Sequence, residues 1–340
     1  MRAYGIGDQS GLGGLHLQTL PDPQPGAGDI VVRVTAAGLN YRDLMVLRGH
    51  YGAPQGRARV PLSDGVGIVT ALGEGVTDIA VGDRVIAPHF LGWHDGRFSM
   101  ALFGADLGVT ADGWLAEQMR LPAAAVVKVP DAVGDATAAT LAVVGGTVWH
   151  AMVAFGEARP GELVLAQGTG GVSIFALQLA KALGADFAIT SSSDAKLDIC
   201  RAMGADYTVN YRTHADWPAA LLAATGGRGA DVVVDTLGFS ALGQTVAATA
   251  VEGRIGTLGA LSGSPQDAAT ASQGLIIAKN IAVKGIASGS RAMLTAALDV
   301  IAQHGIAMRI DREFGFDDAP AAFAYLESGA HMGKILVRMA

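Results

Sequence analysis

The chain has 340 residues, of which 50% are hydrophobic and 16% are charged, with a formal net charge of −7 at pH 7. This length predicts two domains, because a single hydrophobic core stops growing at about 250–300 residues. No lysine- and arginine-rich cluster occurs, so nothing indicates a nucleic-acid or anionic-membrane surface, and the aliphatic runs between the 47 glycines argue against disorder.

The first part of the chain is predicted to be rich in β-strands. Residues 1–14 lack the apolar core of a signal peptide, and no run of about 18 apolar residues occurs, so we expect a cytoplasmic protein without a membrane span. Apolar or alternating runs between glycines predict strands at 30–40, 65–73 and 82–87, and strand character resumes at 115–130.

Residues 88–113 show no clear period and are rich in Gly and Asp, which predicts a long loop. Long loops in compact domains often carry function. This loop contains Trp93, His94 and Asp95 in succession, and Asp95 could orient His94 as a general acid. Because adjacent residues in a strand or loop usually point apart, we do not favour that interpretation.

From Asp135 the pattern becomes helical and then alternates regularly. Helices that begin near residues 171, 194, 215, 240 and 270 separate six strands, LVLAQ, DFAIT, DYTVN, ADVVVDT, GRIGTLG and IAVKGI. This alternation predicts a doubly wound parallel sheet of the Rossmann type, with right-handed crossovers and strand order 3-2-1-4-5-6.

The last segment, from about residue 290, breaks the alternation. It reads as a helix at 291–305, a strand, a short helix at 317–329 and a final strand at 334–339. We expect it to return and pack on the first domain.

The most informative motif is LVLAQGTGGVS at residues 163–173, where a buried strand leads through a glycine-rich turn into a helix. This context predicts dinucleotide binding. Gly168 permits the tight turn, and Gly170 and Gly171 let backbone N–H groups approach a pyrophosphate at the helix N-terminus. The sixth position is Ser173, which is small enough for close helix–strand packing.

The second strand of this domain indicates which nicotinamide cofactor binds. An acid that binds the ribose 2′-OH of NAD is expected at the end of this strand, but three serines, 191–193, stand there. Asp186 opens the strand and lies at the wrong end, and Asp194 begins the next helix, where a carboxylate is favoured as a cap or first-turn residue. Hydroxyl groups and the nearby Lys196 suit a 2′-phosphate, so we predict NADP(H) over NAD(H), although Lys196 could also be a solvated helix residue.

Several segments together resemble the medium-chain dehydrogenase/reductase superfamily, specifically its zinc-free members similar to quinone oxidoreductase. They are residues 36–52 and 65–86, the glycine motif, the AKALGAD and CRAMGAD repeats, VVVDTLG and the closing HMGKILV. The resemblance implies a GroES-like β-rich catalytic domain (1–125 and 289–340), a Rossmann NADP(H)-binding domain (126–288) and an active site in the cleft between them.

The resemblance also indicates where a catalytic zinc would be held in zinc-dependent relatives. Those positions here carry Asn40, the pair Ser63–Asp64 and about Val143. Asn and Ser are poor zinc ligands, and Val cannot bind zinc. The single cysteine, Cys200, cannot supply the four cysteines of a structural zinc site. We therefore predict no metal, with a histidine-only site at His50, His89 and His94 left open.

Without a metal, hydrogen bonds at the site must polarise the substrate. This favours hydride transfer from NADPH to a quinone or an activated, α,β-unsaturated carbonyl. One alternative is a zinc-free alcohol or aldehyde dehydrogenase. A second alternative is a non-enzymatic NADPH-binding protein, either a redox sensor or a structural protein.

By resemblance, the side chains nearest the substrate are Asn40, Tyr41 and Tyr51. Asn40 could donate an amide N–H to a substrate oxygen, and Tyr51 could donate its O–H or a proton. Tyr41 could instead belong to the core, and Tyr51 could anchor a loop. Arg42 and Asp43 follow at an apparent helix start, where a capping bond or an ion pair is expected.

The resemblance implies further cofactor contacts, and Lys334 is a weaker candidate for the 2′-phosphate or the ribose. The predicted cofactor-binding residues are Thr147, Gly168, Gly170, Gly171, Val172, Ser191, Ser192, Lys196, Tyr211, Leu258, Gly259, Ile286, Ala287 and Lys334. His150 is expected to be a packed histidine. The apolar strand IAVKGI is predicted to be a sheet edge that pairs with a second copy in a homodimer.

Overall fold

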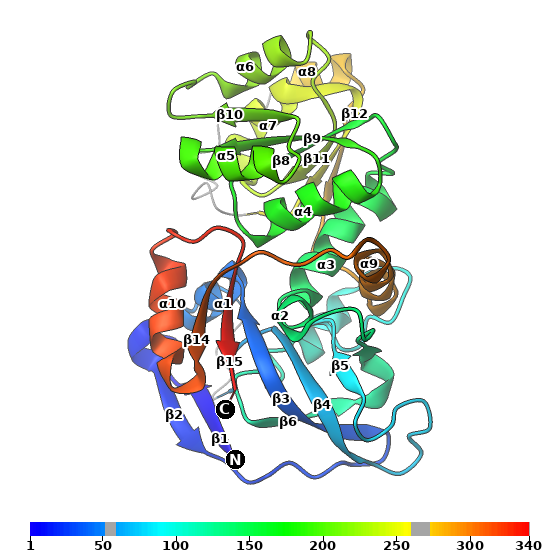
Figure 1. The fold of residues 1–340 in the computed structure, drawn as a ribbon, viewed down its shortest axis with the longest axis vertical. Helices are drawn as coiled ribbons and strands as arrows, with labels where there is room; N and C mark the ends of the chain where they lie inside the picture. Colours follow the sequence, from blue (N-terminus) through cyan, green and yellow to red (C-terminus); the bar gives the residue numbers. More distant parts are fainter. Residues whose placement is uncertain (52–58, 260–272, 340) are drawn as a thin grey trace. The chain divides into compact units, whose positions relative to one another are not determined.

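The computed structural model describes residues 1–51, 59–259 and 273–339 (Figure 1). The chain divides into two compact units. Unit 1 comprises Met1–Gly146 and Ser290–Ala340, and unit 2 comprises Thr147–Gly289. The segment 126–146, assigned above to the nucleotide-binding domain, packs with unit 1.

Unit 1 is built on a seven-stranded sheet with the order β14-β15-β3-β4-β5-β7, in which β6 also pairs with β3, and on a separate β1-β2 hairpin. Its strands are β1 (Arg2–Ile6), β2 (Leu15–Thr19), β3 (Asp29–Leu39), β4 (Asp64–Leu72), β5 (Arg84–Ile86), β6 (Gln118–Pro122), β7 (Val127–Lys128), β14 (Ile310–Gly315) and β15 (Lys334–Arg338).

The long strand β3 organises this sheet. Val32 and Val34 on β3 are buried with Trp114 in the core of unit 1, and burial of one such side chain stabilises the fold by about 1.5–3 kcal/mol. The antiparallel partners β4 and β15 pair with the end of β3, where Gly38 lies opposite Asp64 and Leu39 opposite Ile335. Two segments far apart in the sequence are thereby brought to the same end of β3.

The helices of unit 1 are short except for α9. They are α1 (Tyr41–Leu47), α2 (Asp135–Ala138), α9 (Arg291–His304), α10 (Ala319–Glu327) and α3 (Ala142–Val148), whose last residues belong to unit 2, together with the 3₁₀ turns η1 (Leu12–Gly14), η2 (Met100–Ala105), η3 (Ala123–Ala125) and η7 (Phe316–Asp318). Strand β7 pairs with β5 and Asp135 accepts a bond from Arg84 at 2.7 Å, which is why residues 126–146 belong to this unit.

Unit 2 is a six-stranded parallel sheet with the order β10-β9-β8-β11-β12-β13. In chain order this is 3-2-1-4-5-6, so the predicted Rossmann topology is confirmed. The strands are β8 (Leu163–Gln167), β9 (Asp186–Ser191), β10 (Tyr207–Asn210), β11 (Ala230–Asp235), β12 (Thr249–Thr257) and β13 (Ala282–Gly285).

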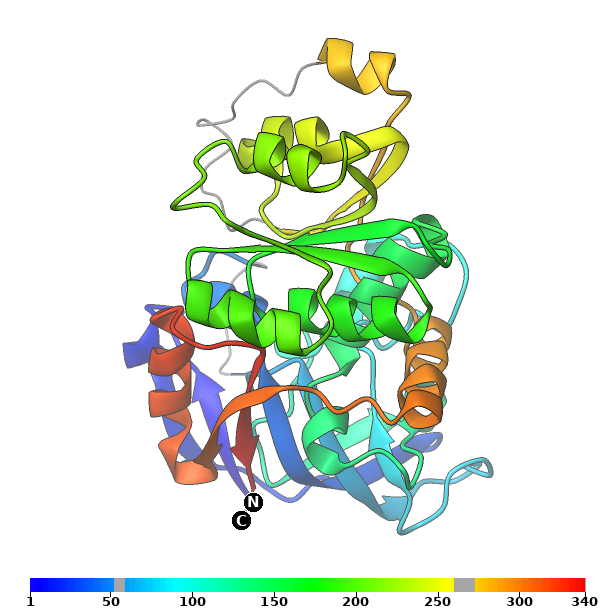
Figure 2. The same ribbon diagram turned by 45° about the horizontal axis from the view of Figure 1, so that its top comes forward.

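Helices cover both faces of the unit 2 sheet (Figure 2). They are α4 (Gly171–Ala182), α5 (Asp194–Ala202), α6 (Trp217–Ala224), α7 (Leu242–Ala248) and α8 (Gln273–Ala278), with the π-helical segment η4 (Trp149–Phe155) and the 3₁₀ turn η5 (Phe239–Ala241). The buried run of β8 and the apolar face of α4 pack together, as expected of a strand buried on both faces.

Some features of the fold were not predicted from the sequence. No strand was predicted in the first 19 residues, where β1 and β2 form an antiparallel hairpin. The predicted start of a helix near Thr270 lies outside the described residues. The closing segment pairs with unit 1 through β14 and β15, as expected.

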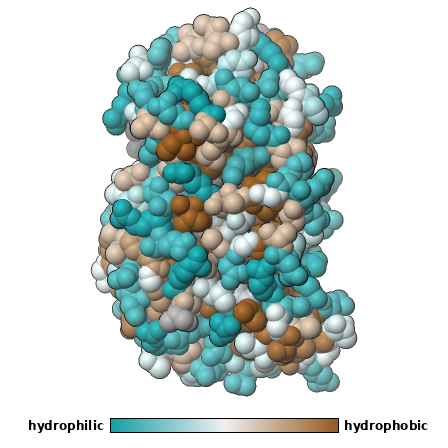
Figure 3. All heavy atoms as spheres, viewed as in Figure 1, coloured by the Kyte–Doolittle hydropathy of each residue, from teal (hydrophilic) through white to brown (hydrophobic). Residues whose placement is uncertain are grey.

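No helix within the described parts of the chain is long and apolar enough to span a bilayer. On the face drawn in Figure 3, hydrophilic and hydrophobic residues are interspersed. This mixture is usual for protein surfaces, because apolar atoms supply more than half of a typical accessible surface.

Candidate functional site

The glycine-rich turn of unit 2 has an open backbone at the start of α4. Gly168 has a φ of 71°, which favours glycine, and Gly170 is the N-cap of α4. Among the described residues, no heavy atom apart from chain neighbours lies within 4 Å of the place where a Cβ would stand on either glycine. A helix N-terminus with such an open approach is suited to a phosphate group.

Small hydroxyl residues hold this turn against the sheet. Ser173 is 1% exposed and donates to the carbonyl oxygen of Gln167 at 2.7 Å. Thr236, at the end of β11, donates to the same oxygen at 2.8 Å. Serine at the sixth position of the motif therefore fits the close packing, and its hydroxyl secures the last residue of β8. Val172, the second residue of α4, is half-buried.

The carboxyl ends of β9 and β10 bring several predicted residues together. Ser191 ends β9, and its carbonyl oxygen accepts a hydrogen bond from the backbone N–H of Tyr211 at 3.0 Å. Tyr211 is 45% exposed, and Ser192 and Lys196 follow β9 as half-buried residues. Arg212, an exposed cation beside Tyr211, was missed by the sequence analysis.

The two acids that flank β9, Asp186 and Asp194, lie where the sequence predicts. Asp186 is the first residue of β9, at the opposite end from the glycine turn. Asp194 is in the first turn of α5, and Asn210 donates to its Oδ1 at 2.8 Å. The N-cap of α5 is Ser193. The residues that follow β9 are therefore two serines, Ser192 and Ser193, then Asp194, with Lys196 two residues further on.

A second part of this edge lies at the ends of β11, β12 and β13. The carbonyl oxygen of Asp235 accepts hydrogen bonds from the backbone N–H groups of Leu258 at 3.0 Å and Gly259 at 3.2 Å. A Cβ on Gly259 would lie 1.6 Å from the carbonyl oxygen of Thr236, so only glycine fits. Asp235, which the sequence analysis missed, follows a run of valines and ties these strand ends together.

The remaining predicted residues of unit 2 come either directly after β13 or before β8 in the sequence. Ile286 follows β13 and donates its N–H to the carbonyl oxygen of Thr257 at 2.8 Å, while Ala287 is exposed. Thr147, in the last turn of α3, is 6% exposed. His150 is packed as expected, with Nδ1 2.7 Å from the carbonyl oxygen of Ser288, and burial lowers its pKa.

In unit 1, Asn40 stands between the end of β3 and the start of α1 and is 9% exposed. Its backbone N–H donates to Oδ2 of Asp43 at 2.8 Å. This bond fixes the first turn of α1 and confirms the expected capping role of Asp43. The Asn40 side chain is thereby held at a strand-to-helix junction.

The Asn40 side chain belongs to a buried network that the sequence analysis did not find. Lys334 Nζ donates to Oδ1 of Asn40 at 2.6 Å, to Oδ2 of Asp64 at 3.1 Å and to the carbonyl oxygen of Leu39 at 2.8 Å. Asn40 Nδ2 donates to Oδ2 of Asp64 at 2.9 Å, and the N–H of Val143 donates to Oδ1 at 2.7 Å. Lys334 is 2% exposed and its three N–H groups have partners in unit 1; its predicted cofactor contact stays a prediction.

A second buried cluster lies beside the first. Arg42 Nη2 donates to both carboxylate oxygens of Asp106, at 2.8 and 2.7 Å, and Arg42 Nη1 donates to Ser63 Oγ. His89 Nδ1 lies 2.8 Å from Asp106 Oδ1. Ser63 Oγ donates to Oδ1 of Asp43 at 2.9 Å, which links this cluster to the start of α1. The ion pair predicted for Arg42 is confirmed, and its partner comes from the long loop.

These groups shift one another's ionisation. Burial raises the pKa of Asp43 to about 6, against the attraction of Arg42. Burial alone would lower the pKa of Arg42, but Asp106 more than offsets this and raises it. Burial also opposes ionisation of Asp106, yet His89 and Arg42 hold its pKa below the usual range. Burial lowers the pKa of His89, so a neutral imidazole donates from Nδ1 to Asp106.

The two predicted tyrosines have different surroundings. Tyr41 is 43% exposed, so the alternative that it belongs to the core is wrong. The ring of Tyr51 lies 4.8 Å from the guanidinium carbon of Arg42, and burial raises its pKa. Tyr51 therefore keeps its phenolic proton at neutral pH and is a hydrogen-bond donor. Trp93 is buried while His94 and Asp95 are exposed, and Asp95 bonds the N–H of Gly96.

The residues at the zinc-ligand positions do not fit a zinc ion. Asn40 offers its oxygen to an ammonium group, Ser63 gives its proton to a carboxylate, and Val143 contributes only a backbone N–H. Asp64 is the one good zinc ligand among these residue types, and both of its oxygens accept hydrogen bonds from groups of unit 1. The Lys334 ammonium lies among them, and a second cation there would be repelled. The described part of the chain holds no group of three or more His, Cys, Asp or Glu side chains suited to a metal.

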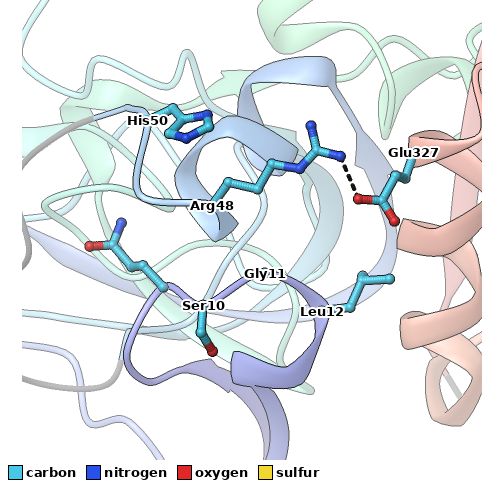
Figure 4. A pocket seen from close by; sticks show the side chains of 7 residues that line it. Ser10, Gly11, Leu12, Arg48, His50 and Glu327 are labelled. Atoms are coloured by element: carbon cyan, nitrogen blue, oxygen red, sulfur yellow. Dashed lines mark hydrogen bonds and ion pairs between the residues drawn. The ribbon is translucent and has the colours of Figure 1, made fainter.

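A separate pocket of unit 1 is drawn in Figure 4. It is lined by Gln9, Ser10, Gly11, Leu12, Arg48, His50 and Glu327. Arg48 forms an ion pair with Glu327 across it, and both side chains are about one-third exposed or more. None of the predicted catalytic or cofactor-binding residues lines this pocket, and an exposed ion pair of this kind has little energetic weight.

Comparisons with known proteins agree with this architecture. Residues 26–131 match the model of the alcohol dehydrogenase GroES-like domain, and residues 171–303 match that of the zinc-binding dehydrogenase domain. A zinc-type alcohol dehydrogenase-like protein of Schizosaccharomyces pombe is 36% identical over 316 residues, which cover 92% of this chain and 91% of the relative.

Two further proteins extend the comparison. An acryloyl-coenzyme A reductase of Sulfurisphaera tokodaii is 29% identical over 96% of this chain and 96% of its own length. The crystal structure of a proposed alcohol dehydrogenase of Sinorhizobium meliloti has a TM-score of 0.89 and 38% identity, and the match covers 95% of this chain and 94% of that one. The chain therefore belongs to the medium-chain dehydrogenase/reductase superfamily and is a nicotinamide-dependent oxidoreductase of that class.

Proposed function

We propose that this enzyme uses NADPH to reduce a quinone or an α,β-unsaturated carbonyl compound, and that it works without zinc. The observation that carries the proposal is the buried network at Asn40. There the ammonium group of Lys334 bonds Asn40 and Asp64, two residues at the positions that hold a catalytic zinc in zinc-dependent relatives. A substrate whose double bond is already activated needs less polarisation than a simple alcohol.

The cofactor fits the carboxyl ends of the unit 2 strands. The open turn at Gly168 and Gly170 would receive the pyrophosphate at the N-terminus of α4. Ser191, Ser192 and Lys196 would bind the 2′-phosphate, with Tyr211 beside them. When bound, the reduced nicotinamide supplies the hydride, and Leu258, Gly259, Ile286 and Ala287 would line its ring.

The chain's own polar groups would receive the substrate oxygen. Asn40 Nδ2 uses one N–H on Asp64 and, within the described residues, has a second that could be given to a substrate. Tyr51 keeps its proton, because burial raises its pKa, and it can donate that proton to the oxygen or carbon that gains charge. Both groups stabilise an oxygen that becomes more negative as hydride arrives.

A substrate panel tests the proposal. Purified enzyme should oxidise NADPH in the presence of quinones, enones or enoyl thioesters, and it should oxidise simple alcohols far more slowly. Acryloyl thioesters belong in the panel, since a relative reduces acryloyl-coenzyme A. Alcohol oxidation that outpaces enone reduction would favour the zinc-free alcohol dehydrogenase, and tight NADPH binding without any turnover would favour a non-enzymatic role.

The metal question has its own measurement. Protein purified without chelators should contain well under one zinc per chain, and dipyridyl or EDTA should leave turnover unchanged. A stoichiometric metal whose removal abolishes activity would contradict the zinc-free part of the proposal.

We also propose a homodimer formed through β13. This strand is the edge of the unit 2 sheet, and all four of its residues are exposed, with Val283 39% exposed. An unpaired apolar edge favours pairing with another strand. Light scattering should give twice the chain mass, and Val283→Lys should shift the protein towards monomer, whereas a monomeric wild type would refute the proposal.

A further inference from the structure

The network around Asn40 determines which end of its amide points in which direction. A lysine ammonium can only donate hydrogen bonds, and a carboxylate can only accept them. Lys334 Nζ lies 2.6 Å from Oδ1, and Asp64 Oδ2 lies 2.9 Å from Nδ2. If the amide turned over, donor would face donor and acceptor would face acceptor. One orientation is therefore strongly favoured.

We propose that Lys334 and Asp64 are positioning residues that hold Asn40 as a hydrogen-bond donor towards a substrate oxygen. The remaining N–H of Nδ2 is the group that would bind the substrate. This inference rests on the proposed function, from which it takes the contact between Asn40 and substrate. It narrows the substrate class to molecules that present an acceptor oxygen, such as a carbonyl or quinone oxygen, at this point.

The fold places these residues with little freedom. Strand β15 pairs with β3 so that Ile335 lies opposite Leu39, which brings Lys334 next to Asn40. The ammonium also bonds the Leu39 carbonyl oxygen at 2.8 Å, and the Val143 N–H holds the other oxygen of Asp64 at 2.7 Å. A buried ion pair is expensive to desolvate, so a fully bonded pair here points to a role in orientation.

A double-mutant cycle separates positioning from general stability. Lys334→Met should lower kcat for enone or quinone reduction by about 10- to 100-fold, because a misplaced donor loses most of its effect. In an Asn40→Ala background the same change should cost less than about twofold, since the group that Lys334 positions is gone. The NADPH dissociation constant should stay within about twofold in Asn40→Ala and, if Lys334 acts only on Asn40, in Lys334→Met as well. A rise of about tenfold or more in Lys334→Met would support the cofactor contact predicted for Lys334 and overturn the positioning role.

The matched control is Lys128→Met. Lys128 also belongs to unit 1 and pairs with Asp83 at 2.8 Å, but its side chain is 52% exposed. This variant should keep wild-type kcat. Equal losses from Lys334→Met in the wild-type and Asn40→Ala backgrounds would overturn the positioning role.

A second variant guards against unfolding. Lys334→Met alone leaves the Asp64 carboxylate buried without its cation, whereas Lys334→Met/Asp64→Asn removes both charges together. This pair should fold, and it should still show the low kcat because Asn40 is free to turn over. A folded double variant with wild-type kcat would refute the proposal.

A spectroscopic measurement tests the orientation without turnover. The chain contains three asparagines, Asn40, Asn210 and Asn280, so selective ¹⁵N-asparagine labelling gives three side-chain amide pairs. The Asn40 amide proton that bonds Asp64 should exchange more slowly with solvent in the wild type than in Lys334→Met, while the Asn210 pair, bonded to Asp194, should not change. Equal exchange rates of that Asn40 proton in the two proteins would overturn the inference.

The two measurements also distinguish the inference from the function on which it rests. A wild type that turns over no member of the panel but shows a protected Asn40 amide refutes the proposed function alone. An active wild type whose Asn40 amide is unaffected by Lys334→Met refutes the positioning role alone.

Discussion

The two candidate regions are built by different means. In unit 2 the predicted cofactor edge consists of backbone groups, glycines and hydroxyls at strand ends, with cations only at its margin. In unit 1 the polar site consists of buried charged side chains, among them Arg42, Asp64, Asp106 and Lys334, each 11% exposed or less. An added side chain should therefore weaken ligand binding at the cofactor edge, whereas the loss of one charged partner should destabilise the fold of unit 1.

The largest effect should come from breaking the charged cluster. Arg42→Met leaves Asp106 buried with only the neutral His89, so the free energy of unfolding should fall by about 3–5 kcal/mol. The matched control is Arg48→Met, which breaks the exposed pair with Glu327 and should cost about 0–1 kcal/mol. Urea denaturation of both variants measures the difference, and similar losses would show that burial of the cluster does not matter.

The next largest effect should come from adding a side chain to the predicted cofactor edge of unit 2. Gly170→Val places a side chain in open space at the start of α4, so the fold should persist while the NADPH dissociation constant rises about 100-fold, or roughly 2.7 kcal/mol. Gly134→Val is the control, because Gly134 is also an N-cap glycine with an extended backbone and open surroundings, at α2. Fluorescence titration with NADPH should separate the two, and an equal affinity in both would contradict the pyrophosphate site.

The free energy of unfolding should depend on pH through Asp43, which is part of the buried charged cluster of unit 1. The pKa of Asp43 is about 6 in the folded protein against 3.8 for the ordinary group, so between these values the folded state holds a proton that the unfolded chain has lost. Asp43 therefore contributes stability below about pH 4, and this contribution of roughly 1–3 kcal/mol is lost as the pH rises through about 6.

Asp43→Asn should remove this slope from urea midpoints measured between pH 4.5 and 7.5. Asp198→Asn, at an exposed carboxylate on α5, should keep the wild-type slope. If the wild type and Asp43→Asn lose stability in parallel, Asp43 does not titrate in this range.

The smallest effect tests the choice of cofactor. Lys196→Met should weaken NADPH binding about tenfold, or roughly 1.4 kcal/mol, and leave NADH binding nearly unchanged. Lys181→Met on α4, which breaks an exposed pair with Asp206, should affect neither cofactor. A wild type that prefers NADH, or equal effects of Lys196→Met on both cofactors, would argue against a 2′-phosphate site at the end of β9.

The features that could be predicted from the sequence are those whose residues are neighbours along the chain. The strand order and helices of unit 2 followed from contiguous motifs, because a glycine turn, a strand and a helix are neighbours along the chain. Asn40 and the capping role of Asp43 followed from a short segment in the same way. The missed hairpin β1-β2 has short strands separated by glycine-rich residues, and it gives a weak local signal.

The network of unit 1 could not be predicted because its members are distant in sequence. The sequence offers Lys334 only as a weaker candidate for the cofactor, because nothing near position 334 indicates that β15 returns to β3 beside Asn40. Asp106 lies in a loop without a period, and only the fold brings it to Arg42. The substitution of Asn40 and Ser63–Asp64 at zinc-ligand positions was the one available signal, and it indicated an altered site without naming the lysine.

The pairing of β15 with β3 has a consequence for protein synthesis. Unit 2 lies within residues 147–289, so a ribosome completes it before Lys334 is translated. Strand β3 must wait for about three hundred further residues before it meets β15, and Asp64 stays without its ammonium partner during that time. We therefore expect the nascent chain to fold unit 2 first. Lys334 can hold the Asn40 amide in its final orientation only after β15 has left the exit tunnel.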